Sequence, residues 1–316
     1  MIKVGKQRGD LTPVALFAYN RPDHLKRTVN SLRTNPLAAR TPLVVFSDAP
    51  KRSEHADGVQ AVRTYLSSVT GFKSVRVVER ERNLGLAASV IDGVTTLCSE
   101  WGRVIVVEDD LVLAPGFLAF MNSALDCYEK SEKVMQVSGY MFPVKHPERL
   151  PEIFFTRLPT SWGWATWDRS WSVFNDDAEA LWAAIKRSGR GTDFDINGSY
   201  DYLDMLRMQA KGKFDSWAIR WYASMFLAYG QCVRPARSLV HNAGFDNTGV
   251  HCGKSTLFDV ELSDLAPDRW PVKVEESHVA IDAMEELFLS FRPSWVRRIA
   301  HGLRRRLARV PPSSSA

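Results

Sequence analysis

Three consecutive carboxylates, Glu108, Asp109 and Asp110, directly follow the apolar run 104–107 in the stretch VIVVEDDLVLA. Neighbouring side chains of a strand point to opposite faces, so we expect Glu108 and Asp110 to share one face and Asp109 to point to the other. Carboxylates away from water are costly unless they are paired. Carboxylate and water oxygens suit a hard divalent cation, which often takes its remaining ligands from a substrate's phosphates. The alternative is an acidic turn that is solvated at the edge of a sheet.

Short apolar segments alternate with helical patterns through the first half of the chain. We expect strands at 13–19, 41–48, 74–80, 102–110 and 134–140. This alternation predicts an α/β fold with a mostly parallel sheet flanked by helices. Ligands of such sheets bind at the carboxyl ends of the strands, where Asn20, Arg21 and Asp48 also lie. No GxGxxG follows the first strand and no GxxxxGK[ST] occurs, which excludes the two common phosphate loops.

Charge is unevenly distributed along the 316 residues, whose formal net charge is +5. Seven arginines and no acid lie between Phe291 and Ala316, so the rest of the chain carries a charge of −2. This near-neutral body does not indicate a nucleic-acid partner. The four cysteines have no metal-binding spacing, and we expect reduced thiols in a cytoplasmic protein. We see no signal-peptide pattern and no run near the ~20 apolar residues of a membrane span.

Several motifs occur in the order and spacing of GT-A-fold glycosyltransferases: ALFAYNRPDHLKRTVNSL, VVFSDAP, RNLGLAASVIDGV, VIVVEDDLVLAPGFLAF, SWGWATWDRSW and DSWAIRW. Over about residues 12–255 the chain resembles bacterial family-2-like sugar transferases. It is more remotely similar to the N-acetylglucosaminyltransferase that begins complex N-glycan branching. The resemblance implies an Asp-x-Asp-type motif with Mn²⁺ or Mg²⁺ on the diphosphate of a nucleotide sugar. It makes Asp110 the metal ligand and places Glu108 and Asp109 on the ribose or sugar of the donor.

Other donor-side candidates lie at the beginnings of helices or in a late loop. Asn20 and Arg21 start a helix and suit a phosphate or nucleotide edge, or form a plain helix cap. In similar enzymes an acid at the position of Asp48 binds the base; otherwise Asp48 is a turn residue. Arg82 and Asn83 open the helix expected at 83–101, where Gly85 permits close backbone approach, and Asn83 is also a capping candidate. His241 and His251 flank a late loop that in similar enzymes folds over the diphosphate. His251 would complete the metal or phosphate site or is simply a surface residue, and Asn242 is a further candidate.

Sugar transfer needs a base that takes the proton of the acceptor hydroxyl, and a carboxylate can do this. We assign Asp215, because the branching enzyme has its base in an acidic pair just before a Trp, and Asp215-Ser216 precedes Trp217 here. The register is open by one residue, and either residue could instead cap the following helix. Asp201 and Asp204 are fallback candidates. One such base implies a single displacement with inversion at the anomeric carbon.

Aromatic residues of the second half are candidates for stacking on the acceptor sugar. Trp162, Trp164 and Trp167 alternate with small residues in SWGWATW, and Trp217 follows the candidate base. The alternative is a core position, above all for Trp167. Arg220, one turn after Trp217, would pair with a phosphate or with Asp215. We expect the segment 154–171 to be loop-like and helices near 176–187, 199–211 and 213–230.

The expected organisation is one large domain. Residues 1–140 form its nucleotide-sugar-binding half, 141–266 its acceptor and catalytic half, and 267–316 a C-terminal extension. In the extension, Trp295, Ile299, Leu303 and Leu307 alternate with arginines at helical spacing. Such a basic amphipathic helix can lie on an anionic membrane surface, or it is simply solvated or contacts a partner protein. Membrane contact would place the protein on the inner face of the cytoplasmic membrane and suit a lipid-linked glycan acceptor.

The sequence therefore predicts a metal-dependent, inverting glycosyltransferase that uses a nucleotide sugar, UDP-linked by expectation. Its acceptor would be a glycan in surface polysaccharide or lipopolysaccharide synthesis. One alternative is a catalytically silent glycan-binding or scaffold protein on the same fold, which the intact acidic cluster disfavours. The other is a sugar-nucleotide pyrophosphorylase, which needs a glycine-rich basic loop where this chain has FAYNRPDHL.

Overall fold

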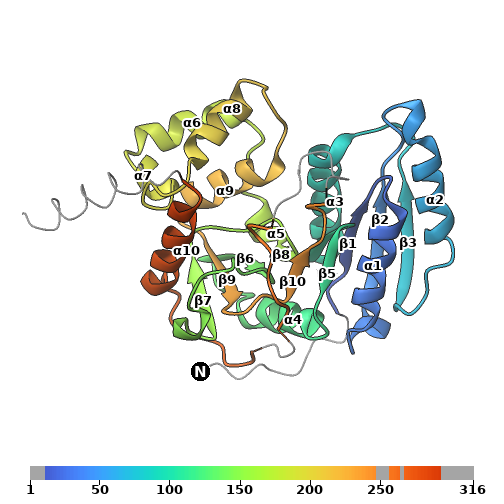
Figure 1. Ribbon diagram of the computed structural model, residues 1–316, viewed down its shortest axis with the longest axis horizontal. Coiled ribbons are helices and arrows are strands. Elements are labelled where there is room, and N and C mark those ends of the chain that lie inside the picture. The colour runs from blue at the N-terminus through green and yellow to red at the C-terminus, as the bar shows by residue number, and fades with distance from the viewer. Residues whose placement is uncertain (1–10, 247–255, 264–266, 293–316) are drawn as a thin grey trace, which may run out of the picture.

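The computed structural model describes residues 11–246, 256–263 and 267–292. Within them, eight strands form one sheet in the order β3-β2-β1-β4-β8-β6-β9-β7 (Figure 1). These strands are β1 (Val14–Ala18), β2 (Pro42–Ser47), β3 (Ser74–Glu79), β4 (Arg103–Glu108), β6 (Val134–Ser138), β7 (Ile153–Thr156), β8 (Trp164–Trp167) and β9 (Gln231–Pro235). A smaller antiparallel pair joins β5 (Leu111–Leu113) to β10 (Val240–Asn242).

The large sheet is mostly parallel, which confirms the α/β prediction. Strands β1–β4 run parallel to one another. Strand β8 lies between β4 and β6 and is antiparallel to both, so β6 runs in the direction of β4. Strand β9 is parallel to β6. Strand β7 is antiparallel to β9. The carboxyl ends of these six parallel strands therefore lie at one edge. Since β7 and β8 fall in the aromatic segment 154–171 or at its start, the expectation of a loop there is wrong.

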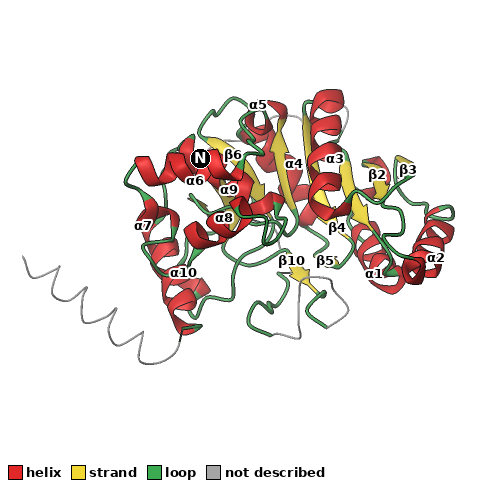
Figure 2. Cartoon of the chain, turned by 90° about the horizontal axis from the view of Figure 1, so that it is seen from above, coloured by secondary structure: helices red, strands yellow, loops and turns green. Residues whose placement is uncertain are grey.

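Helices cover both faces of the sheet. They are α1 (Pro22–Arg33), α2 (Ala56–Leu66), α3 (Gly85–Trp101), α4 (Phe117–Cys127), α5 (Asp168–Trp171), α6 (Ala178–Arg187), α7 (Gly191–Phe194), α8 (Tyr202–Ala210), α9 (Trp217–Leu227) and α10 (His278–Ser290). Viewed from above, α3 lies on one side of β1–β4 and α1 on the other (Figure 2). Strand alternation sorts the core accordingly. Val104 and Val106 face α3, whereas Ile105 and Val107 face α1 and α4.

A second core forms beside the β6–β9–β7 end of the sheet, between α6, α8, α9 and α10. Helices α6, α9 and α10 begin at Asp177, Ser216 and Ser277, whose side chains accept a backbone N–H of the first turn. Sequence reasoning found α6, α8 and α9. It missed α10, because the signal after Pro267 is weak.

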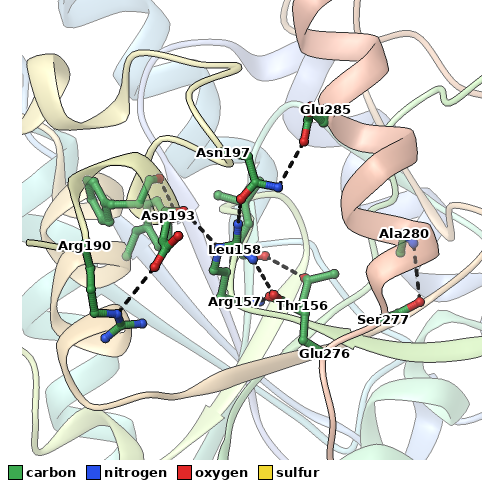
Figure 3. A network of polar contacts seen from close by, with 12 residues as sticks. Thr156, Arg157, Leu158, Arg190, Asp193, Asn197, Glu276, Ser277, Ala280 and Glu285 are labelled. Atoms are coloured by element: carbon green, nitrogen blue, oxygen red, sulfur yellow. Dashed lines mark hydrogen bonds and ion pairs between the residues drawn. The ribbon is translucent and has the colours of Figure 1, made fainter. Parts of the chain in front are cut away.

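Part of the expected C-terminal extension belongs to the packed body. Trp270 is fully buried against Phe120 and Tyr128. Figure 3 shows Arg157, just after β7, bound to Glu276 and to Asn197, which in turn donates to Glu285 of α10. Residues 267–292 are therefore packed against both the sheet and the second core.

Candidate active site at the carboxyl edge of the sheet

The acidic cluster lies where β4 emerges from the core. Val104 to Val107 are fully buried, and the strand ends at Glu108. Asp109 and Asp110 form a turn that leads into β5. The strand alternation that we used to separate Asp109 from Asp110 does not extend into this turn, so that expectation is wrong. Both carboxylates instead bind the same guanidinium, that of Arg21.

Asp109 is buried and ties three elements together. Its Oδ1 accepts a hydrogen bond from Arg21 Nη2 at 2.6 Å, and its Oδ2 accepts one from the Tyr19 backbone N at 3.2 Å. Its backbone oxygen accepts from Thr28 Oγ1 of α1 at 2.8 Å. Burial raises the pKa of Asp109, and the Arg21 charge opposes that rise. Asp109 is therefore built into the fold and orients Arg21.

Asp110 retains an oxygen for a ligand. Its Oδ2 accepts from Arg21 Nη2 at 2.9 Å, whereas its Oδ1 is buried and has no hydrogen-bond partner in the described part of the chain. Arg21 Nη1 is likewise buried and unpartnered there. A buried carboxylate oxygen without a donor is costly, and a hard cation relieves that cost. The residues present therefore fit a divalent metal at Asp110.

A metal at this site would need ligands from a bound molecule. Among the described residues, no group of three or more His, Cys, Asp or Glu side chains is arranged to hold a metal ion. This is the arrangement expected of Mg²⁺-type sites that use one or two carboxylates together with substrate phosphates.

Glu108 completes the cluster at the end of β4. Burial raises its pKa to about 8, and repulsion from Asp110 and Asp109 adds to the rise while Arg21 opposes it. One guanidinium thus faces three carboxyl groups, so the apo cluster carries an excess of negative charge that a cation or a proton must balance.

The late loop reaches the cluster through β10. Asn242 pairs with Leu111, and Ala243 N donates to the Asp110 backbone oxygen at 2.9 Å. Gly244 N donates to Asn242 Oδ1 at 2.7 Å. Gly244 packs so closely that a Cβ there would lie 2.9 Å from Asp110 Cγ. Asn242 was only a secondary candidate from the sequence and Gly244 was not a candidate, although NAG follows His241 in the late loop.

Asp48 stabilises the beginning of α3 in the described chain. Its carboxylate accepts four hydrogen bonds: from Leu84 N, Gly85 N and its neighbour Ala49 N at 2.9 Å each, and from Asn83 Nδ2 at 3.0 Å. These bonds fix the beginning of α3, where Gly85 has φ +76°. Asp48 and Asn83 thus bind each other, and a nucleotide base at Asp48 would have to share an already saturated carboxylate.

The other donor-side residues differ in how firmly they are held. Arg82 is exposed and forms no ion pair with a described residue, so it is free to take a ligand. Asn20 is partly buried, and its backbone oxygen packs against Gly58 of α2. Sequence reasoning missed Tyr19, whose hydroxyl contacts His55 Nδ1 at 2.5 Å and accepts from Lys51 N at 2.9 Å. Its position directly after β1 was the available signal.

A cavity of about 250 Å³ is lined by residues that follow β6 and β7 and by residues of the second core. Its wall includes Trp162, Tyr140 and Phe258, together with Ser216 and Ile219 of the α9 region. The Trp162 ring contacts the Phe245 ring edge-on at 5.5 Å between centroids, and Phe245 follows Gly244, which touches Asp110. The expected acceptor half therefore supplies an aromatic cavity with Trp162 in its wall, and Phe245 and Gly244 connect that wall to the acidic cluster.

Trp164 and Trp217 are not acceptor-binding residues in this structure, which corrects the sequence assignment. They are 0% and 3% exposed and stack on each other at 5.0 Å in the core under α3. A ring that is covered on both faces cannot stack on a sugar. Trp167, also buried, donates its indole N–H to the Leu125 backbone oxygen at 3.2 Å, as its core alternative predicted.

Asp215 stands just before α9 and forms an ion pair with Arg220 at 2.7 Å. Its side chain is 65% exposed, and Arg220 also binds Asp176 at 2.5 Å. Ser216, not Asp215, is the N-cap of α9, and Ser216 lines the cavity. Asp215 is thus an oriented carboxylate one residue away from the cavity wall. The fallback candidates Asp201 and Asp204 form exposed ion pairs with Arg292 and Arg207.

Two expectations lie outside the described residues: the role of His251, and the basic helix around Trp295 to Leu307. In the part of the chain that the structure describes, no helix combines the length and apolar character needed to cross a bilayer.

The known proteins that this chain resembles are named as sugar transferases. Residues 2–145, which include β1–β5 and the acidic cluster, match the model of the GNT-I family. The alpha-1,3-mannosyl-glycoprotein 2-beta-N-acetylglucosaminyltransferase of Arabidopsis thaliana is 26% identical, over 59% of this chain and 46% of its own length. The chain thus spans less than half of that curated relative.

The solved structures that resemble this chain also carry the names of sugar transferases. Mannosyltransferase PcManGT from Pyrobaculum calidifontis, in complex with GDP-Man and Mn²⁺, is 14% identical over 70% of this chain and 73% of its own (TM-score 0.36). Glucosyl-3-phosphoglycerate synthase from Mycobacterium tuberculosis, in complex with Mn²⁺, UDP and glucosyl-3-phosphoglycerate, is 16% identical over 52% and 58% (TM-score 0.34). TM-scores below 0.5 say nothing about the ligands of this chain.

Proposed function

We propose that this protein is a metal-dependent glycosyltransferase that moves a sugar from a nucleotide diphosphate sugar to a hydroxyl of a glycan acceptor. The observation that carries the proposal is the buried, unpartnered Asp110 Oδ1 beside Arg21, inside the segment that matches the GNT-I family model. The finer parts of the proposal are a UDP-linked donor, inversion at the anomeric carbon, and a role in surface polysaccharide or lipopolysaccharide synthesis. They rest on the sequence resemblance.

Asp110 would hold Mn²⁺ or Mg²⁺ together with oxygens of the donor diphosphate. Such a cation supplies Lewis-acid stabilisation of the charge that builds on the leaving diphosphate. Arg21 contributes a second positive charge at the same place, and its unpartnered Nη1 can donate to a phosphate oxygen. Its two bonds to Asp109 and Asp110 fix the guanidinium before the donor arrives.

Asp215 is our candidate for the general base. Its carboxylate would accept the proton of the acceptor hydroxyl as the oxygen attacks the anomeric carbon. The ion pair with Arg220 orients it, and its neighbour Ser216 lines the aromatic cavity where we place the acceptor. A single displacement with one base inverts the anomeric configuration. Trp162 supplies the exposed part of an aromatic wall for the acceptor sugar.

The remaining partner proposals concern location. Peripheral contact of the basic C-terminal segment with an anionic membrane would bring the site to a lipid-linked acceptor on the cytoplasmic side. Co-sedimentation of the full chain with vesicles of anionic and of neutral lipid tests this part independently of catalysis.

The central test is the thermal stability of the protein with a panel of nucleotide sugars, each with Mn²⁺ and with a chelator. We expect at least one nucleotide sugar to raise the melting temperature only when Mn²⁺ is present. Asp110→Asn should abolish this response. A matched control is Asp126→Asn, which breaks an Asp–Arg pair with Arg103 at the opposite end of β4 and should keep the response. A response that survives Asp110→Asn refutes the assignment of the metal site.

Sugar transfer is measured separately from donor binding. With a glycan acceptor, release of free nucleoside diphosphate should depend on both the metal and Asp215, and NMR of the product should show inversion. A protein that binds the donor but releases nothing with any acceptor would be a glycan-binding protein instead of a transferase.

A further inference from the structure

Arg234 of β9 is a buried cation without a counter-ion in the described chain. Its side chain is 0% exposed. Nη2 donates to the Leu158 backbone oxygen, whereas Nε and Nη1 have no hydrogen-bond partner among the described residues. No described carboxylate lies within ion-pair distance of it. A guanidinium in such surroundings is costly, because burial removes its hydration and the Leu158 oxygen replaces only part of it.

The other well-buried arginines of the described chain are all paired. Arg103 binds Asp126, and Arg220 binds Asp176 and Asp215. The partly buried Arg21 and Arg157 also have carboxylate partners. Arg169, which is also partly buried, has no carboxylate partner among the described residues either, but backbone oxygens of Tyr128, Glu129 and Val134 accept from its guanidinium. Arg234 differs because it lacks a carboxylate partner and its Nε and Nη1 also have no hydrogen-bond partner among the described residues.

Arg234 lies behind the wall of the aromatic cavity and is not itself a lining residue. The Leu158 residue that it binds lines the cavity, and its guanidinium carbon is 5.9 Å from the centroid of the Phe142 ring, another lining residue. The pKa values of Tyr140 and Tyr202, which also line the cavity, are raised by burial, and the Arg234 charge opposes the rise in both. Groups in the cavity wall therefore feel this cation.

The residues that line the cavity include no Asp, Glu, Lys or Arg. With apolar and aromatic walls the effective dielectric is low, so a charge acts over several ångströms. Arg234 thus contributes a positive potential to the cavity. Asp259 and Asp195, which do not line the cavity, act in the opposite sense on the pKa of Tyr140 and of Tyr202. The larger cavity of about 360 Å³ near Arg157 differs, because Asp193 and Glu276 line it alongside its basic residues.

We propose that this cavity binds an acceptor sugar that carries an anionic group, a carboxylate or a phosphate, and that Arg234 selects that group. The identification of the bound sugar as an acceptor rests on the proposed function, whereas the cavity and the buried cation are observed independently of it. The anion supplies the counter-charge that Arg234 lacks, and the aromatic wall packs against the sugar ring.

A purely structural role for Arg234 makes a different prediction. Gln136 of β6 donates to the Thr160 backbone oxygen as Arg234 donates to that of Leu158, so both side chains hold the segment that leads from β7 to β8. Arg234→Gln removes the charge and shortens the side chain, but it keeps an amide donor on that side of Leu158. Arg234→Lys keeps the charge. Comparison of the two separates charge from hydrogen bonding.

The experiment measures binding of small sugars to the full chain without donor, by isothermal titration. The probes are glucuronate and glucose 6-phosphate as the carboxylate and phosphate arms, glucose as the neutral arm, and inorganic phosphate. We expect wild type to bind at least one anionic sugar about tenfold or more tightly than glucose. Arg234→Gln should remove that preference, and Arg234→Lys should retain most of it.

Stability provides a second readout. Removal of an unpaired buried charge should leave the ligand-free Arg234→Gln protein as stable as wild type or more so. Arg103→Gln, which strands Asp126, should destabilise and serves as the contrast. A large loss of stability in Arg234→Gln would mean that the cation is satisfied in the folded protein, and would overturn the proposal.

Three binding outcomes also overturn it: no binding of any anionic sugar to wild type, equal affinity for charged and neutral sugars, or an unchanged preference in Arg234→Gln. Inorganic phosphate that binds as tightly as glucose 6-phosphate would show a plain anion site and reject the sugar assignment. The nucleotide and Mn²⁺ stability test at Asp110 reports separately on the proposed function, so failure of one does not imply failure of the other.

Discussion

Gly244→Ala tests whether the late loop and the acidic cluster form one site. A Cβ at this position would lie 2.9 Å from Asp110 Cγ and closer still to Oδ2. Ordinary carbon contacts need about 3.5 Å or more, so the carboxylate must move by at least about 0.5 Å. That shift disturbs the Oδ2 bond to Arg21, now 2.9 Å, and displaces the free Oδ1.

Small displacements matter because a metal–diphosphate site demands fixed geometry, and a misplacement of about 1 Å can cost about a hundredfold in rate. We expect Mn²⁺-dependent nucleotide binding to weaken about tenfold or more, with a change in melting temperature of only a few degrees. Isothermal titration of nucleotide with Mn²⁺ measures this, with Gly191→Ala as the control, since its Cβ would meet only the end of the Leu203 side chain. Wild-type affinity in Gly244→Ala would refute the geometry proposed for Asp110.

Three further changes have defined outcomes. The pKa of Glu108 is raised from 4.5 to about 8, so the folded protein holds a proton that the unfolded chain releases. This contribution to the free energy of unfolding is complete below pH 4.5 and is lost as the pH rises through 8. With a chelator present, wild type should therefore lose stability between pH 5.5 and 9 relative to Glu108→Gln; parallel curves in denaturant titrations would contradict this. Trp217→Ala should lower the free energy of unfolding by about 3–5 kcal/mol, because it leaves a cavity where the ring was buried against Trp164. A variant of wild-type stability with weakened acceptor binding would instead support the sequence prediction that Trp217 binds the acceptor. Asp48→Ala strands the N–H groups of Leu84 and Gly85, and should cost about 1–3 kcal/mol in thermal or denaturant melts; an unchanged stability would indicate that Asp48 serves a ligand instead.

The predictions that succeeded relied on periodicity and on strand ends. Alternating apolar strands and helices predicted β1–β4 and the helices between them to within a few residues. Polar residues after β1 and β4 were predicted to share one edge, and Arg21 does meet Asp109 and Asp110 there. The separation of Asp109 from Asp110 failed because β4 ends at Glu108 and a turn follows. The acceptor roles of two tryptophans failed because of neighbours far along the chain. Trp164 and Trp217 have the composition of a sugar platform, but each is covered by the other and by α3.

The sequence by itself determined that three carboxylates follow a buried strand of an α/β sheet, because apolar spacing and the ends of apolar runs are local properties. Only the tertiary structure decided which of their oxygens is left without a partner, since that depends on Arg21 from β1–α1 and on Gly244 from a loop more than a hundred residues away. The same holds for Arg234. Its presence in β9 can be read from the sequence. Its burial without a carboxylate partner, behind the wall of an uncharged cavity, depends on residues far away in the chain such as Phe142 and Leu158.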